Sequence, residues 1–211
     1  SALQLLGGSS DFFSPIGYLN SQVFFLTLPI LLGILAISLG SNLIAKEEQD
    51  KTIETLLSRP ISRTKFLLAK ALSGVLILSF VTLVGLITTV LSAKFVDLEV
   101  SVARMSLVTL VCFLMVLSFA AVAFILTATG RARGASIGIA TTVAFGGYIV
   151  SSLAGTVDWL KAPAKLFPFE YYQSEAILRD TYNWANAIFF VALVIILGIL
   201  SWIVFKKRDL A

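Results

Sequence analysis

Five long apolar runs limit what this sequence can fold into. A helix rises about 1.5 Å per residue, so about 20 apolar residues are needed to cross a hydrocarbon layer about 30 Å thick. Each run is continuous, whereas the strands of a membrane barrel alternate in polarity at every second residue. The sequence therefore predicts an all-α, polytopic membrane helix bundle. The transmembrane helices are expected at residues 23–44, 66–91, 105–127, 135–156 and 187–205.

The composition agrees with a single transmembrane domain over residues 1–211 rather than a soluble fold. Hydrophobic residues make up 58% of the chain and charged residues 13%, and the mean hydropathy is +0.95. The chain has no histidine and one cysteine, Cys112, in the middle of the third run. A disulfide within the chain is thereby excluded, no metal site is expected, and Cys112 is interpreted as a small packing residue.

The distribution of basic residues predicts the orientation. If the segment 45–65 is cytoplasmic, ten basic residues lie in cytoplasmic segments and five in external ones. The positive-inside rule favours this arrangement, with a cytoplasmic C-terminus and an external segment 1–22. An external start implies a further span before Ser1, so we expect six spans in the full protein, in the cytoplasmic (inner) membrane. The basic residues are scattered over loops, which argues against nucleic acid as a partner.

The longest connection, residues 157–186, is expected to form short helices as an external re-entrant or interfacial loop. Pro163 and Pro168 interrupt it. Trp159 and Trp184 bracket it, as aromatic residues do at the headgroup level of a membrane. The alternative is an ordered connecting loop with no role of its own.

Charged residues concentrate in AKEEQDKTIETLLSRPISRTK, the segment 45–65 between the first two runs. We expect residues 43–58 to be helical, because Ile53, Leu56 and Leu57 form an apolar patch at helical spacing. The charged rim around the patch is too acidic for a helix that lies on an anionic leaflet. A small apolar patch with a charged rim fits a protein partner, and a solvated connector is the alternative.

The end of this segment predicts a sharp corner between two helices. Pro60 cannot continue a helix and disfavours the helical region for the residue before it. Ser62 is positioned to cap a second helix that begins near Arg63. The segment is therefore interpreted as a helix, a corner, and a helix that enters the membrane.

The stretch EEQDKTIETLLSRPISRTKFLLAK closely resembles the first cytoplasmic loop of the ABC type-2 transporter permeases. That loop has an acidic pair, Thr, an apolar residue, Glu, Leu-Leu, Pro and Ser-Arg, and ends in a Lys within the next span. Lys51 stands where many members have glycine. Two further stretches, LFPFEYYQSEAIL and FKKRDL, resemble the Pro-Phe-x-Tyr segment and the basic tail of the family. The matching residues of the loop are Glu47, Glu48, Thr52, Ile53, Glu54, Leu56, Leu57, Ser58, Pro60, Ile61, Ser62, Arg63 and Lys70.

The resemblance implies the fold and the partners of an ABC type-2 exporter. The chain would pair with a second copy or a related permease, and with two cytoplasmic ATPase subunits that supply the ATP and Mg²⁺ sites. The segment 45–65 would carry the coupling helix, which sits in a groove of the ATPase. The residues expected to couple to the ATPase are Glu47, Glu48, Thr52, Ile53, Glu54, Leu56, Leu57, Pro60 and Arg63.

The resemblance also implies where a substrate would pass. The dimer seam of the family is formed by the spans equivalent to 23–44 and 135–156. Small residues cluster on spans 105–127 and 135–156, and close helix packing is their default explanation, with a pathway lining as the alternative. Spans without charge favour a hydrophobic or amphipathic cargo. The residues expected to face a substrate pathway are Thr27, Ser38, Thr141, Thr142 and Tyr148.

Several activities are disfavoured by residues that the sequence lacks. The phosphate-binding motif G-x-x-x-x-G-K-[ST] is absent, so the chain is not expected to be an ATPase or to bind a cofactor itself. It has no histidine and its acidic residues lie in loops, so it is not expected to be an enzyme of another kind. Lys70 is the one ionisable residue inside a predicted span, and it lies close enough to the interface to reach water. An ion-coupled secondary carrier is therefore poorly supported. A non-transporting membrane scaffold or sensor remains the main alternative.

Overall fold

The first apolar run forms one long helix that extends beyond both predicted ends. The structure, a computed structural model, describes residues 14–51, 62–96, 98 and 100–208. Ser14 caps α2 (Pro15–Leu19) by accepting a hydrogen bond from the N–H of Gly17. The helix continues through the π-helical stretch η1 (Asn20–Thr27) into α3 (Leu28–Gln49).

The start of this helix corrects the boundary expected between residues 22 and 23. Residues 16–22 were expected in an external segment, yet they belong to the helix Ile16–Gln49. Asn20 and Ser21 are polar but buried. The Ser174 hydroxyl donates to Asn20 Oδ1 at 2.7 Å, and Ser21 donates to the Gly17 carbonyl at 2.8 Å. Buried polar groups that have partners can continue an apolar helix, which hydropathy alone does not reveal.

Four further long helices complete the bundle: α5 (Arg63–Phe95), α6 (Val102–Ala128), α7 (Arg133–Ala154) and α11 (Ala185–Lys207). With Ile16–Gln49, they make five helices long and apolar enough to cross a membrane. The part of the chain that the structure describes contains no strand. This confirms, for the described residues, the prediction of an all-α fold with five helices that are long and apolar enough to cross a membrane.

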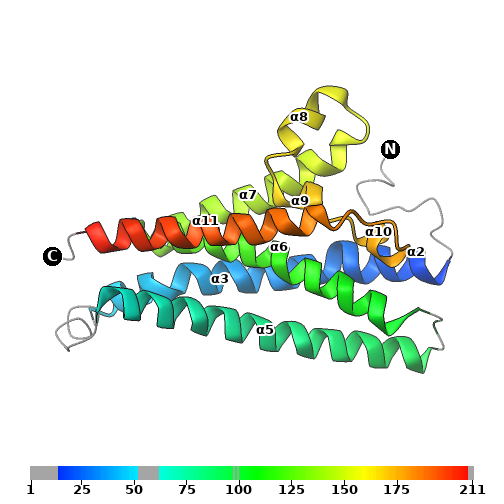
Figure 1. The fold of residues 1–211 in the computed structure, drawn as a ribbon, viewed down its shortest axis with the longest axis horizontal. Helices are drawn as coiled ribbons and strands as arrows, with labels where there is room; N and C mark the ends of the chain where they lie inside the picture. Colours follow the sequence, from blue (N-terminus) through cyan, green and yellow to red (C-terminus); the bar gives the residue numbers. More distant parts are fainter. Residues whose placement is uncertain (1–13, 52–61, 97, 99, 209–211) are drawn as a thin grey trace.

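The five long helices lie side by side along the long axis of the molecule (Figure 1). α3 and α11 end at one end of the bundle, where α5 and α7 begin, and we call this the tail end. The short helices α9 and α10 lie towards the other end, which we call the loop end. α8 projects from the side of the bundle beyond the end of α7 (Figure 1).

The connection between α7 and α11 forms short helices, as the sequence predicts. They are η2 (Asp158–Leu160), α8 (Lys161–Ala164), α9 (Pro168–Tyr171) and α10 (Ser174–Leu178). The connection is tied to the first helix by Tyr172, whose hydroxyl donates to the Phe24 carbonyl at 2.6 Å. Trp159 is 74% exposed and Trp184 48% exposed, so both rings can contact the lipid or water around the protein.

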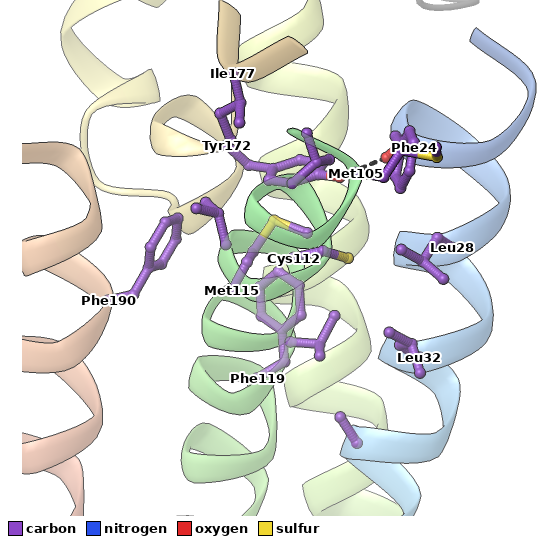
Figure 2. Packing of buried hydrophobic residues seen from close by; sticks show 14 of the residues in the cluster. Phe24, Leu28, Leu32, Met105, Cys112, Met115, Phe119, Tyr172, Ile177 and Phe190 are labelled. Carbon is purple, nitrogen blue, oxygen red and sulfur yellow. Dashed lines mark hydrogen bonds between the residues drawn. The ribbon is translucent and has the colours of Figure 1, made fainter. Parts of the chain in front are cut away.

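α6 is the central helix and packs against each of the other four long helices. Its buried face carries Met105, Cys112, Met115 and Phe119, all at most 2% exposed. Figure 2 shows these side chains between Phe24, Leu28 and Leu32 of the first helix and Phe190 of α11. The interpretation of Cys112 as a packing residue is confirmed, because its side chain is fully buried in this core.

The helix predicted over residues 43–58 is wrong as a single helix. α3 ends at Gln49, with the Asp50 N–H bonded to the carbonyls of Lys46 and Glu48. Lys51 then has φ +53°, a left-handed conformation that cannot continue a right-handed helix. Residues 52–61, which include most of the predicted apolar patch and Pro60, lie outside the described part of the chain.

Candidate functional site

Ion pairs at the tail end connect α3 with two other parts of the chain. Glu47 Oε1 lies 2.5 Å from Lys70 Nζ of α5. Glu48 Oε1 lies 2.6 Å from Nη1 of Arg208, just beyond α11. The same Arg208 nitrogen also donates to the Thr127 carbonyl of α6 at 3.4 Å. The end of α3 is therefore held to α5, to α6 and to the residue that follows α11.

Arg63 completes this arrangement, which we call the tail-end cluster: Glu47, Glu48, Arg63, Lys70 and Arg208. Arg63 Nη1 donates to the Arg208 carbonyl at 2.6 Å and to the Lys206 carbonyl at 3.4 Å. Cationic donors near the last carbonyls of a helix are favourable, because those carbonyls carry the negative end of the helix dipole. The cluster thus joins the beginning of α5 to the end of α11.

The predicted cap at Ser62 is confirmed and sets where α5 begins. Ser62 has an extended backbone with ψ 145°, and its hydroxyl accepts a hydrogen bond from the Lys65 N–H at 3.3 Å. Within the first turn of the helix, the Thr64 hydroxyl accepts a hydrogen bond from Trp202 Nε1 at 3.0 Å. The first turn of α5 is therefore attached to α11 as well as capped.

The tail-end cluster contains three of the nine residues predicted to couple to an ATPase. Glu47 and Glu48 have side chains only 21% and 22% exposed, because they turn towards their cationic partners. They hold the end of α3 and do not present a free charged rim. The other six predicted residues, Thr52, Ile53, Glu54, Leu56, Leu57 and Pro60, lie outside the described residues.

Sequence reasoning grouped Lys70 with Glu47, Glu48 and Arg63 only as a residue of the family-like motif, and it did not group Arg208 with them. Lys70 was interpreted as reaching water, but it pairs with Glu47 instead. Arg208 lies 160 positions after its partner Glu48, and no local pattern links the two. The sequence did offer one signal for this pairing. A carboxylate in the last turn of a helix that continues an apolar span needs a cation at the same depth.

A second candidate site is an apolar cavity of about 580 Å³ between α3 and α7, here called the α3–α7 groove. Pro29, Gly33 and Ile37 line it from α3, and Ala144 and Phe145 line it from α7. Three predicted pathway residues, Ser38, Thr141 and Tyr148, also line this groove.

The other two predicted pathway residues do not line the groove. Thr27 is exposed and donates its hydroxyl hydrogen bond to the Gln22 carbonyl, within the π-helical stretch. Thr142 is exposed and donates to the Gly138 carbonyl at 2.9 Å. Each hydroxyl donates to a carbonyl of its own helix, and neither threonine belongs to the lining of the groove.

A third candidate site is a cavity of about 870 Å³ near the loop end, lined by many polar and charged residues, and we call it the loop-end pocket. Its lining comes from η1, α7 and the short helices of the loop. The lining includes the charged and polar residues Asn20, Ser151, Lys161, Lys165, Glu170, Glu175 and Arg179.

Most charges of the loop-end pocket have a partner of opposite sign. Arg179 Nε lies 2.9 Å from Glu175 Oε1, one turn apart in the chain. Lys161 Nζ lies 2.7 Å from Asp158 Oδ1. Glu170 and Lys165 are the exceptions, because neither forms an ion pair with any residue that the structure describes.

Partial burial raises the pKa of the Glu170 carboxyl, while the Ser151 hydroxyl and the Lys165 ammonium oppose that rise. The Ser151 hydroxyl lies close enough to act on Glu170 but has no hydrogen-bond partner of normal geometry. Lys165 is exposed and acts through the electric field alone. Glu170 is therefore a half-buried acid whose negative charge is only partly compensated.

Aromatic rings stand between the loop-end pocket and the α3–α7 groove. The Tyr148 ring centroid lies 6.0 Å from that of Phe25 and 5.3 Å from that of Phe169. Phe25 and Phe169 line both cavities. The polar and the apolar cavity therefore meet at one set of rings.

No group of three His, Cys, Asp or Glu side chains in the described ranges could hold a metal ion. The fold instead defines a multi-pass membrane protein, all-helical where it is described, with an ion-paired tail end and two adjoining cavities. The chain belongs to the family described as "Protein of unknown function (DUF2705)", whose family model matches residues 7–211. No curated protein matches the sequence.

Proposed function

We propose that this chain is the membrane permease subunit of an ATP-driven transporter with the ABC type-2 exporter fold. It works as a dimer with a second copy or a related permease, and separate cytoplasmic ATPase subunits bind ATP and Mg²⁺. The cargo is a hydrophobic or amphipathic molecule. In this proposal the tail end, with the C-terminus, is cytoplasmic, as the excess of basic residues in its segments favours.

The observation that carries the proposal is the tail-end cluster. The stretch with the permease-like motif connects α3 to α5, and both helices are fastened at this end. Glu47 joins α3 to α5, Glu48 joins α3 to Arg208, and Arg63 joins α5 to the end of α11. A partner that pushes on the connecting segment would therefore move three long helices together, which coupling to an ATPase requires.

The α3–α7 groove supports the choice of cargo. Its lining is almost entirely apolar, with Ser38, Thr141 and Tyr148 as the polar exceptions. Ligand cavities are typically apolar with a few placed polar groups. A hydrophobic or amphipathic molecule fits such a lining better than a bare ion does.

The test is capture of the tagged chain from its own membranes in mild detergent, with the co-purifying proteins identified by mass. We expect an ATPase subunit with a phosphate-binding motif, and ATP hydrolysis in the captured complex. Leu56→Arg places a charge in the predicted apolar patch and should reduce capture by about 30-fold or more, the effect of losing a central interface residue.

The matched control is Leu166→Arg, because Leu166 is 78% exposed in the loop between α8 and α9, away from the tail end. This variant should capture the ATPase as the unchanged chain does. Absence of any ATPase with the unchanged chain overturns the proposal and favours a membrane scaffold. Equal capture by Leu56→Arg would show that the ATPase binds elsewhere.

A further inference from the structure

The loop-end pocket and the α3–α7 groove together resemble the two halves of an amphipathic molecule. One cavity is polar and charged, the other is apolar, and Phe25 and Phe169 belong to both. We propose that the two cavities form one binding site for an amphiphile with an ammonium-bearing polar end. The polar end lies against Glu170 in the loop-end pocket, and the apolar chain lies in the α3–α7 groove.

The charges of the pocket indicate an ammonium group. Arg179 is matched by Glu175, and Lys161 by Asp158, so these cations already have anionic partners. Glu170 has none among the described residues, although it is half-buried next to Ser151. A partly buried carboxylate is stabilised by a cation that brings its own hydrogen-bond donors, and a primary ammonium supplies three.

Lys165 distinguishes a zwitterionic polar end from a simple amine. Its side chain is exposed and acts on Glu170 without forming an ion pair. An anionic group beside the ammonium could lie near Lys165 while the ammonium contacts Glu170. A phosphoethanolamine head carries both groups, and a glycerol phosphate head carries only the anion.

The groove supplies the place for the chain. Tyr148, Phe169 and Phe25 form the boundary, with ring centroids 5.3–6.0 Å apart. On the apolar side, Gly33 leaves open space, because a Cβ built there meets no atom within 4 Å. An alkyl chain that enters past the rings would therefore find an unfilled apolar surface on α3.

This inference concerns binding and needs neither an ATPase nor transport. That the bound amphiphile is also the cargo rests on the proposed function. The two ideas can fail separately, because capture of an ATPase tests one and lipid binding to the purified chain tests the other.

The experiment uses the full chain, purified in detergent and titrated with lipids while bound molecules are counted by native mass spectrometry. The probes are phosphatidylethanolamine and phosphatidylglycerol with identical acyl chains, and phosphoethanolamine without a chain. We expect phosphatidylethanolamine to bind at least about fivefold more tightly than phosphatidylglycerol, as one charge-assisted contact would give. Phosphoethanolamine alone should bind far more weakly than the lipid.

Two variants assign the contacts. Glu170→Gln should reduce the preference for phosphatidylethanolamine to less than about twofold, since it removes the charge and keeps the size. The control Asp180→Asn removes a carboxylate that is 64% exposed and pairs with Arg104, and since neither residue lines the pocket, this variant should keep the preference. Gly33→Leu fills the groove and should weaken both lipids about equally.

Gly138→Leu is the control for the groove, because Gly138 also has open space but does not line the groove. Equal binding of the two lipids to the unchanged chain overturns the proposal. Persistence of the preference in Glu170→Gln overturns the role of Glu170. Binding of phosphoethanolamine as tight as that of the lipid would show that the groove takes no part.

Discussion

Lys51, just beyond the end of α3, adopts a backbone conformation that a residue with a side chain disfavours. Its φ of +53° lies in the left-handed region, where a residue with a Cβ is strained and glycine is not. A lysine at this position therefore carries backbone strain that the sequence pattern did not reveal.

Lys51→Gly should stabilise the folded chain by up to about 1 kcal/mol, because it relieves the left-handed strain. Lys51→Val should destabilise it by about 1–2 kcal/mol, since a β-branched residue tolerates this region least. Thermal unfolding of the detergent-solubilised variants measures both effects. A loss of stability in Lys51→Gly would contradict the explanation.

At the scale of elements, the contact between α3 and α6 decides the shape of the core. A Cβ built on Gly40 would overlap the carbonyl oxygen of Ala120 and lie 3.0 Å from its Cα. The two backbones therefore touch at this point, which is how small residues bring membrane helices together. The neighbouring Gly33 lies on the same helix but has open space.

Gly40→Ala should destabilise the bundle by about 1–3 kcal/mol, because a backbone atom must move to admit the methyl group. Gly33→Ala is the matched control, since it adds the same methyl group to the same helix without a clash. It should be neutral or stabilising by up to about 1 kcal/mol, in keeping with the helix propensities of the two residues. Similar unfolding temperatures for the two variants would rule out the proposed close contact.

The π-helical stretch Asn20–Thr27 shows that the pattern of apolar residues does not always predict where a helix begins. Hydropathy predicts that the first span begins at residue 23, because Asn20, Ser21 and Gln22 are polar. The helix begins earlier because Asn20 and Ser21 find partners in Ser174 and Gly17. One of those partners is 154 positions away, so no local pattern could have indicated it.

At the scale of the whole molecule, the pair of Glu48 and Arg208 links the end of the first long helix to the last described residue. Each side chain is less than a quarter exposed, so the pair is partly shielded from water. Partly buried charge-assisted hydrogen bonds contribute more than exposed ion pairs. The pair therefore stabilises the arrangement of α3 relative to α11.

A double-mutant cycle of Glu48→Gln and Arg208→Gln should give a coupling energy of about 1–2 kcal/mol. The same cycle on the exposed pair Asp158 and Lys161 should give less than about 0.5 kcal/mol. Chemical or thermal unfolding of the four variants of each cycle supplies the numbers. Equal coupling in both cycles would mean that the tail-end pair adds no specific stability.

The candidate sites were foreseen to different extents. Five pathway residues were expected from the family resemblance, and three of them, Ser38, Thr141 and Tyr148, line one groove. Glu170 was not chosen, because the loop-end pocket collects residues from η1, α7, α9 and α10. Only the fold of the loop against α7 and the first helix gives that carboxylate its half-buried, uncompensated position.

The sequence by itself determined the membrane class, the five helices and the cap at Ser62. Each of these depends on short-range chemistry: apolar length, continuous hydropathy, and a hydroxyl that bonds a backbone N–H three residues on. The tertiary structure alone decided the pairs Glu47–Lys70 and Glu48–Arg208 and the junction of the two cavities. Those features join residues distant in the chain, so they exist only once the helices have packed and their charged ends have been brought to the same depth.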